Sequence, residues 1–224
     1  MIKIILDTYG VHLEIEENNQ KQFKFLSFPK FQQLILQQYS LNSGLLPLGT
    51  IAYKKNGYTE SVAILESPKI RTVKYEMSIE NAGKTETKIK SFRIPLPPFL
   101  FIVNLDLSKR IKNVKVYALK NLFLTHNSLL YHAPFSNTHN DGIICFGDGD
   151  KLIDKPFKHL AGLRSIIEIF FLQPFNKDLD RGLDDGNEPT LEFFKKYNGK
   201  KQFPLSILKP YKKFSEVWQE NNEI

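Results

Sequence analysis

Hydrophobic and polar positions alternate at the start of the chain. Residues 1–8 and 11–16 keep this alternation on either side of a Tyr-Gly pair, which predicts two short strands joined by a turn. Farther on, apolar residues recur at helical spacing and predict a helix from about Phe28 to Tyr39. Because the next strand signal begins only near residue 50, residues 1–45 are expected to form an N-terminal extension.

Strand patterns dominate the following stretch. Alternating or apolar runs separated by turn signals predict three strands, at Thr50–Lys54, Ser61–Glu66 and Ile70–Ser78. Asn56-Gly57 favours a tight hairpin between the first two. The expected arrangement is an antiparallel meander, and the polar residues Glu80–Lys88 are expected to form a loop or a longer turn after it.

A proline-rich segment precedes the most hydrophobic strand. Proline cannot donate a backbone hydrogen bond within a central strand. Pro95, Pro97 and Pro98 are therefore expected to lie before the predicted strand Phe99–Val103. The next strand is predicted at Val114–Leu119, where the residues alternate in character.

Loop and helix signals fill the C-terminal half. Residues 121–144 contain many turn formers and little periodicity, which predicts a long ordered loop, and such loops in compact domains are usually functional. One apolar stripe predicts a helix over Leu160–Phe171. The acidic residues 176–190 are expected to be mobile, and short helices are expected at Leu191–Tyr197 and Tyr211–Gln219.

Together these elements predict an α+β fold. A chain of 224 residues can bury one full core, so one domain is the simplest organisation. The core is expected at about residues 45–175, with residues 1–45 as the N-terminal extension. Residues 176–224 would then supply the mobile loop and the C-terminal helices.

Composition limits the location and the partners. The chain has no run of about 18 apolar residues that would predict a membrane span. Its single cysteine cannot form an intramolecular disulfide, which fits a reducing compartment such as the cytoplasm. The 18 phenylalanines are expected to fill much of the core. The net charge of +7 favours acidic partners, although the lysines are spread along the chain as on an ordinary solvated surface.

The one cysteine, Cys145, follows a polar segment that is rich in turn formers. Asp141 and Gly142 mark a tight turn, after which Ile143 and Ile144 are expected to face the core and to leave the thiol at the edge of the packed region. A single cysteine is most often a small buried apolar residue. Its neighbours therefore decide whether it is a nucleophile.

The segment YHAPFSNTHNDGIICFG around Cys145 resembles the active-site stretch of ubiquitin-conjugating enzymes. Those enzymes have an asparagine eight residues before the catalytic cysteine, a glycine three residues before it and an apolar residue directly before it. Asn137, Gly142 and Ile144 occupy these offsets here. The proline-rich approach to Phe99–Val103 and the helix that ends at a Pro/Asn/Asp turn are also similar, so the resemblance implies a ubiquitin-conjugating (UBC-like) fold.

The prokaryotic branch of this fold is the closer likeness. The segments LLPLGTIAY, PLPPFLFIV, KVYALK and LYHAPFSNTHNDGIICFG resemble, in this order, protein B of the bacterial PRTRC cassette and related ubiquitin-like conjugation operons. The resemblance covers roughly residues 45–175. It implies three partners, namely a ubiquitin-like protein, a ThiF-like activating enzyme and a target protein. The chain departs from the family at Phe135-Ser136, where a His-Pro pair is usual, and at Phe146, where leucine is usual.

The resemblance implies that Cys145 carries the ubiquitin-like protein as a thioester and passes it to an amine. Sulfur is both a good nucleophile and a good leaving group, so neither step needs a strong base beside the thiol. Asn137 is expected to stabilise the oxyanion of the tetrahedral intermediate or to hold the active loop. The alternative for Asn137 is that its side chain only closes a turn by bonding its own backbone.

An attacking lysine must also lose a proton, which carboxylates or an imidazole near the thiol could assist. Asp178 matches, within one residue, an acidic position in the turn that follows the helix in this family. Asp141, His139 and His132 lie nearer to Cys145 in the sequence. For each of these four residues, an ordinary solvated loop position is the competing interpretation.

No cofactor is expected. The five histidines and the cysteine show no metal-ligand spacing, and no glycine-rich phosphate loop occurs, so any use of ATP belongs to a partner. Two other functions stay open. A catalytically silent adaptor that binds a ubiquitin-like protein would typically lack the thiol. A basic nucleic-acid-binding module would fit the charge, but helix-turn-helix, zinc-finger and RNP-like patterns are missing from the sequence.

Overall fold

The computed structural model describes residues 2–17, 20–31, 44–56, 59–81, 84–149, 154–177, 179 and 189–220. The chain divides into two compact units, Met1–Ser43 and Gly44–Ile224. Of the helix expected from Phe28 to Tyr39, residues 28–31 are helical and the remainder lies outside the described residues. Most of the acidic stretch 176–190 also lies outside them.

The N-terminal unit contains an antiparallel three-stranded sheet. Its strands are β1 (Ile2–Leu6), β2 (Val11–Glu17) and β3 (Gln20–Leu26), in that spatial order. The Asp7 carboxylate accepts hydrogen bonds from the backbone of Tyr9 (2.7 Å) and Gly10 (2.9 Å), which closes the first turn. The two predicted strands are confirmed. The third was missed because its polar residues weaken the alternation that identifies a strand.

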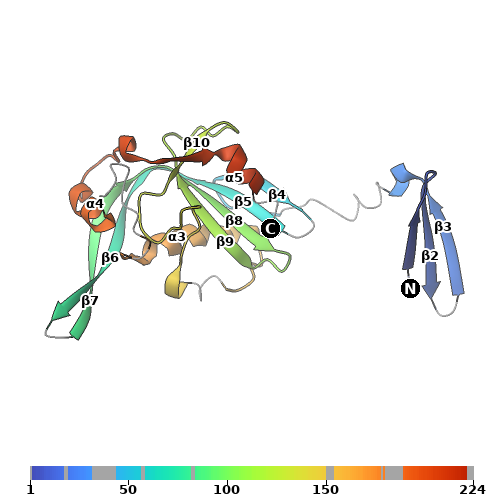
Figure 1. Ribbon diagram of the computed structural model, residues 1–224, viewed down its shortest axis with the longest axis horizontal. Coiled ribbons are helices and arrows are strands. Elements are labelled where there is room, and N and C mark those ends of the chain that lie inside the picture. Colours follow the sequence, from blue (N-terminus) through green and yellow to red (C-terminus); the bar gives the residue numbers. More distant parts are fainter. Residues whose placement is uncertain are drawn as a thin grey trace. The chain divides into compact units, whose positions relative to one another are not determined.

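The second unit is built on a six-stranded sheet with the spatial order β12-β10-β9-β8-β5-β4 (Figure 1). Its strands are β4 (Thr50–Lys55), β5 (Thr59–Glu66), β8 (Phe99–Asp106), β9 (Ile111–Ala118), β10 (Leu129–His132) and β12 (Pro210–Lys213). The strands predicted over 50–54, 61–66, 99–103 and 114–119 are therefore confirmed. The expected loop over 121–144 is interrupted by β10.

β6 (Lys69–Asn81) does not continue the predicted meander but belongs to a second sheet. It pairs with β7 (Lys84–Leu96), and the short β11 (Pro174–Phe175) lies parallel to β6. β5 pairs with β8 and not with β6, so the uninterrupted meander was wrong. The loop expected at Glu80–Lys88 was also wrong, because most of these polar residues belong to the ends of the β6–β7 hairpin, which extends from the body in Figure 1. Polar side chains on an exposed hairpin conceal the pattern of a strand.

Helices flank the sheets. They are η1 (Gly147–Gly149), η2 (Leu160–Leu163), α3 (Arg164–Leu172), α4 (Thr190–Tyr197), η3 (Leu205–Ile207) and α5 (Phe214–Glu220). The helices predicted over 160–171 and 191–197 are confirmed. The last prediction was partly wrong, because Tyr211 belongs to β12 and α5 begins only at Phe214. None of the described helices is long and apolar enough to span a membrane.

The central strand β8 is buried on both faces. Phe99 and Phe101 point into a large aromatic cluster on one face, where their rings lie 5.8 and 6.2 Å from the ring of Phe171 on α3. On the other face, Leu100 belongs to a smaller cluster with Phe214 of α5. The expectation that phenylalanines fill the core is confirmed, and the mostly antiparallel sheets with few helices make this an α+β protein.

Candidate active site

The segment before Cys145 is a tight hairpin. The Cys145 backbone N–H donates to the Asn137 carbonyl (2.8 Å), and the His139 N–H donates to the Ile143 carbonyl (2.8 Å). A turn closes the hairpin, since the Gly142 N–H donates to the His139 carbonyl (2.9 Å). Asn137 and Cys145 are thus opposite each other across the hairpin. The spacing of eight residues between Asn137 and Cys145 therefore reflects their position as a cross-strand pair in this hairpin.

The turn of this hairpin is held against β9. Gly142 has a φ of +85°, and a Cβ atom at this position would lie 2.7 Å from the Tyr117 ring. The Tyr117 hydroxyl donates to the Asp141 carbonyl (2.6 Å), and the Val116 N–H donates to the Gly142 carbonyl (2.9 Å). Burial raises the pKa of Tyr117, so this hydroxyl stays a donor. Glycine is therefore required at position 142.

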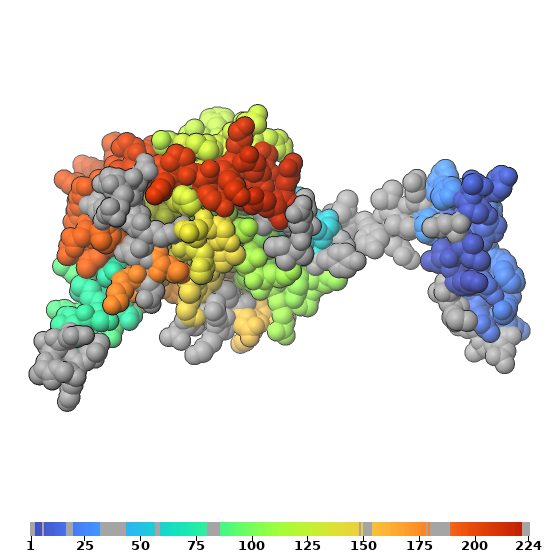
Figure 2. Space-filling model, viewed as in Figure 1, coloured from blue at the N-terminus to red at the C-terminus, as the bar shows by residue number. Residues whose placement is uncertain are grey.

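The Cys145 thiol is exposed between two anchored neighbours. The side chains of Ile144 and Phe146 are both buried, and the Ile144 N–H donates to the Val114 carbonyl (2.8 Å). The yellow part of the chain, which contains this loop, lies at the surface of the second unit in Figure 2. A pocket of about 310 Å³ opens beside the thiol and is lined by Glu76, Asn137, Cys145, Phe146, Gly147, Gln173, Pro174, Asn176 and Leu179. The thiol is therefore reachable while its backbone is fixed.

Two side-chain amides join the Cys145 loop to the segment after α3. Asn137 donates through Nδ2 to the Pro174 carbonyl (3.1 Å), and Gln173 donates through Nε2 to the Phe146 carbonyl (2.6 Å). Asn137 also has a φ of 62°, a backbone conformation that asparagine tolerates better than most residues. Its amide thus bonds a distant segment and not the backbone of its own turn.

The family model for prokaryotic E2 family D matches residues 31–211. The chain belongs to this family. The match spans the Cys145 hairpin, α3 and both sheets of the second unit. Membership indicates an E2-like conjugation function, with a ubiquitin-like protein and an activating enzyme as its general partners. Searches among curated proteins and among solved structures gave no significant match.

Membership in prokaryotic E2 family D confirms the resemblance to prokaryotic ubiquitin-conjugating enzymes. The narrower likeness to protein B of the PRTRC cassette stays a prediction. The same holds for the detailed UBC-like topology, because the family match concerns the sequence and no solved structure was matched.

The other predicted residues of this family D protein lie in different places. The Asp141 carboxylate accepts from the Ile143 N–H (3.1 Å) and so supports the turn, while His139 is exposed at that turn. The His132 ring lies against Tyr211, with ring centroids 4.8 Å apart. None of the three lines the pocket beside Cys145. Asp178 lies outside the described residues.

Glu76 lines the Cys145 pocket and was not predicted from the sequence. It lies on β6, and the parallel pairing of Pro174 with Lys74 and of Phe175 with Tyr75 brings that strand beside the Cys145 loop. No described residue forms an ion pair with the Glu76 carboxylate. Since Glu76 belongs to a polar strand far upstream, no spacing in the sequence points to it.

No group of three or more His, Cys, Asp or Glu side chains suited to a metal occurs among the described residues. The site that the structure does describe is an exposed thiol, three side-chain amides and one carboxylate around a small pocket. Such a set can accept an acyl group on sulfur, donate hydrogen bonds to an oxyanion and receive a proton.

Proposed function

We propose that this chain carries a ubiquitin-like protein as a thioester on Cys145 and transfers it to an amine on a target protein. The proposal rests on one observation above all: an exposed thiol lies opposite Asn137 on a braced hairpin beside a pocket. A structural cysteine has no need of such an arrangement, since it is usually buried. The UBC-like topology is part of the same proposal.

In the charging step, the Cys145 thiolate attacks the carbonyl carbon of the thioester that the activating enzyme holds. A new C–S bond forms to Cys145, the C–S bond to the activating enzyme breaks, and the departing thiolate takes up a proton. The reaction exchanges one thioester for another, so it needs positioning more than strong activation. The fixed backbone on both sides of Cys145 supplies that positioning.

In the transfer step, an amine attacks the thioester carbon, a C–N bond forms and the bond to the Cys145 sulfur breaks. The Asn137 amide has a second N–H beside the one that Pro174 accepts, and this group donates to the developing oxyanion. Hydrogen bonds of this kind contribute about 3 kcal/mol to a transition state. The sulfur leaves as a thiolate and recovers a proton from solvent.

A lysine ammonium group has no lone pair, so it loses one proton to solvent before the attack, and the neutral amine loses a second proton as the C–N bond forms. Glu76 is the carboxylate that lines the pocket among the described residues. A carboxylate stabilises the ammonium form, so Glu76 does not lower the pKa of the amine. It instead positions the amine and accepts its proton as the C–N bond forms.

The decisive experiment combines the chain with its activating enzyme, its ubiquitin-like protein and ATP, followed by intact-mass measurement. We expect an adduct that dithiothreitol removes. Cys145→Ala should form no adduct, and Cys145→Lys should form an adduct that dithiothreitol does not remove. Lys112→Ala, at an exposed residue of β9 that does not line the Cys145 pocket, is the matched control and should charge like the unchanged chain.

Two results would contradict the thioester proposal. One is an adduct on the unchanged chain that persists in reducing buffer. The other is stable binding of the ubiquitin-like protein with no covalent adduct, which would support the silent adaptor instead.

A further inference from the structure

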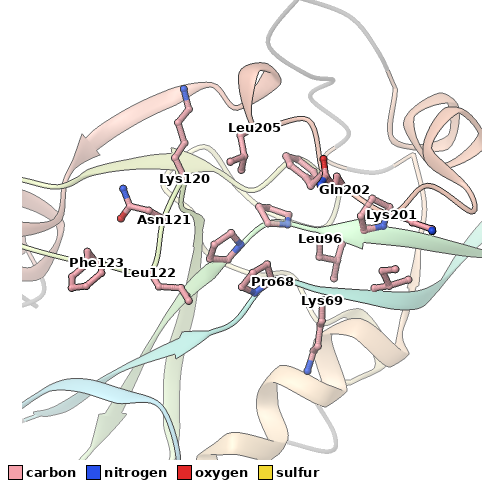
Figure 3. Close-up of a pocket in the computed structure, with 15 residues that line it drawn as sticks. Pro68, Lys69, Leu96, Lys120, Asn121, Leu122, Phe123, Lys201, Gln202 and Leu205 are labelled. Atoms are coloured by element: carbon pink, nitrogen blue, oxygen red, sulfur yellow. The ribbon is translucent and has the colours of Figure 1, made fainter.

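A second pocket lies in the same unit and shares no lining residue with the Cys145 pocket. It encloses about 770 Å³, within the range of ligand-binding pockets in proteins. Four segments line it: the start of β6, the end of β7 with the prolines that follow, the residues after β9, and the residues from Lys201 to the start of η3 (Figure 3). We call it the proline pocket, after Pro68, Pro95, Pro97 and Pro98 in its lining.

The lining of the proline pocket is mostly apolar. Its prolines have no backbone N–H, so they offer a partner apolar rings but no backbone donors. Leu122 is 45% exposed and Phe123 is 88% exposed, although both line the pocket. Exposed apolar residues that gather around a pocket mark a binding surface far more often than singly scattered ones.

The charge of the lining has one sign. Its ionisable residues are Lys69, Lys120 and Lys201, and no carboxylate lines the pocket. In Figure 3 these lysines lie on different sides of the apolar residues. Lys69 already pairs with Glu66, whereas the Lys120 ammonium lies 4.7 Å from the centre of the Tyr131 ring. Lys120 and Lys201 are therefore the cations best able to meet a ligand carboxylate.

We propose that the proline pocket binds an extended segment of a partner protein in which apolar side chains alternate with carboxylates. The apolar floor takes the aliphatic side chains, and the separate lysines at the rim pair with the carboxylates between them. Nucleic acid fits the pocket less well. Proteins that bind single-stranded nucleic acid combine a continuous basic groove with aromatic side chains on which the bases stack. The lining of the proline pocket contains no arginine, and its lysines lie apart.

The test uses the full chain and a fluorescein-labelled decapeptide of alternating Leu and Glu, with binding measured by fluorescence anisotropy. Two peptides serve as ligand controls, one with Lys in place of Glu and one with Ser in place of Leu. A labelled thymidine decanucleotide tests nucleic acid. We expect the Leu/Glu peptide to bind and the three other probes to bind at least about tenfold more weakly.

Two variants and a matched control place the binding. Phe123→Ala should weaken the Leu/Glu peptide about tenfold, and Lys201→Glu should weaken it about fivefold. Lys112→Glu makes the same change at an exposed lysine on β9 that does not line the pocket, and its affinity should stay unchanged.

Three outcomes would overturn the proposal: no binding of the Leu/Glu peptide, equal binding of the Lys-containing peptide, or equal losses from Lys112→Glu and Lys201→Glu. Tighter binding of the thymidine probe, with the same loss on Phe123→Ala, would assign the pocket to nucleic acid. None of these measurements involves Cys145, so they test the proline pocket separately from the thioester proposal.

Discussion

Asn137 combines two properties that are separable by mutation. Its backbone has a positive φ of 62°, and its side-chain amide reaches the Pro174 carbonyl at 3.1 Å. Glycine accepts such a backbone conformation without strain, whereas alanine is strained in it by about 1 kcal/mol. Substitution by each of these two residues therefore distinguishes the loss of the amide from distortion of the loop.

We expect Asn137→Gly to slow discharge of the thioester to free lysine about a hundredfold, because the oxyanion loses a donor. Charging should slow much less, since that step exchanges one thioester for another and needs positioning more than activation. Asn137→Ala should slow discharge similarly and should also unfold about 1 kcal/mol more readily than Asn137→Gly. Single-turnover discharge and urea unfolding measure the two effects. Normal discharge by Asn137→Gly would leave Asn137 with a backbone role only.

Glu76→Gln keeps the size of the side chain and removes its charge. We expect discharge to free lysine to slow about tenfold near neutral pH, because the amine loses its proton acceptor. The loss should shrink as the pH rises, since hydroxide then replaces Glu76 as the acceptor of the proton that leaves as the C–N bond forms. Glu192→Gln, on the exposed face of α4, is the control. An equal loss at every pH would point to a structural effect.

At the scale of elements, one buried carboxylate joins β5, β6 and α3. The Glu66 side chain is 3% exposed and pairs with Lys69, Arg71 and Arg164. Arg71 also forms a two-pronged contact with Glu168 on α3 (2.7 and 2.8 Å). This network fixes the helix against the hairpin, and the residues just after that helix hold the Cys145 loop.

The network predicts a specific dependence of stability on pH. Burial alone raises the pKa of Glu66, but hydrogen bonds from Lys69 and Arg71 and the charge of Arg164 outweigh it and lower the pKa. The stabilisation is therefore complete above the ordinary pKa of about 4.3 and is lost as the pH falls through the lower folded value.

Glu66→Gln should accordingly cost about 1–2 kcal/mol in the free energy of unfolding at about pH 7, because three partly exposed cations lose the charge of the buried carboxylate that they share, while Arg71 keeps Glu168. The difference from the unchanged chain should narrow in acid as Glu66 becomes protonated. Urea unfolding at several pH values measures it, and Glu220→Gln removes an exposed ion pair with Lys212 as the control. A difference that stays constant down to acid pH would contradict this account.

Elements that bury an apolar face were predictable from the sequence, and polar ones were not. β8 and the α3 helix are rich in apolar residues, and this composition identifies them as buried elements. The strand predicted at Ile70–Ser78 is confirmed as part of β6, whereas the polar stretch Glu80–Lys88 was expected to be a loop because its side chains show no strand pattern. The site divided in the same way. Asn137 and Cys145 are paired locally, whereas Glu76 reaches the pocket only through the pairing of β6 with β11.

At the scale of the whole molecule, the two units have separate interiors. Both hydrophobic clusters of the core consist of residues from the second unit, which also contains both pockets. The family match begins at residue 31, so it includes little of the first unit. In the first sheet, Phe23 and Phe25 are largely exposed, and Val11 is fully buried. We therefore expect the second unit to fold without the first.

Removal of residues 1–43 tests this independence. We expect the shortened chain, which begins at Gly44, to keep the far-ultraviolet circular dichroism signal of a folded second unit. Its midpoint temperature of unfolding should lie within about 2 °C of that of the full chain, because neither hydrophobic cluster loses a residue. Charging of Cys145 should also persist. The matching deletion of residues 210–224 removes the edge strand β12 and the helix α5, whose Phe214 and Val217 pack on one face of the main sheet, and it should abolish cooperative unfolding. Equal damage from the two deletions would show that the first unit completes the core of the second. Loss of charging without loss of stability would instead give residues 1–43 a role in partner binding.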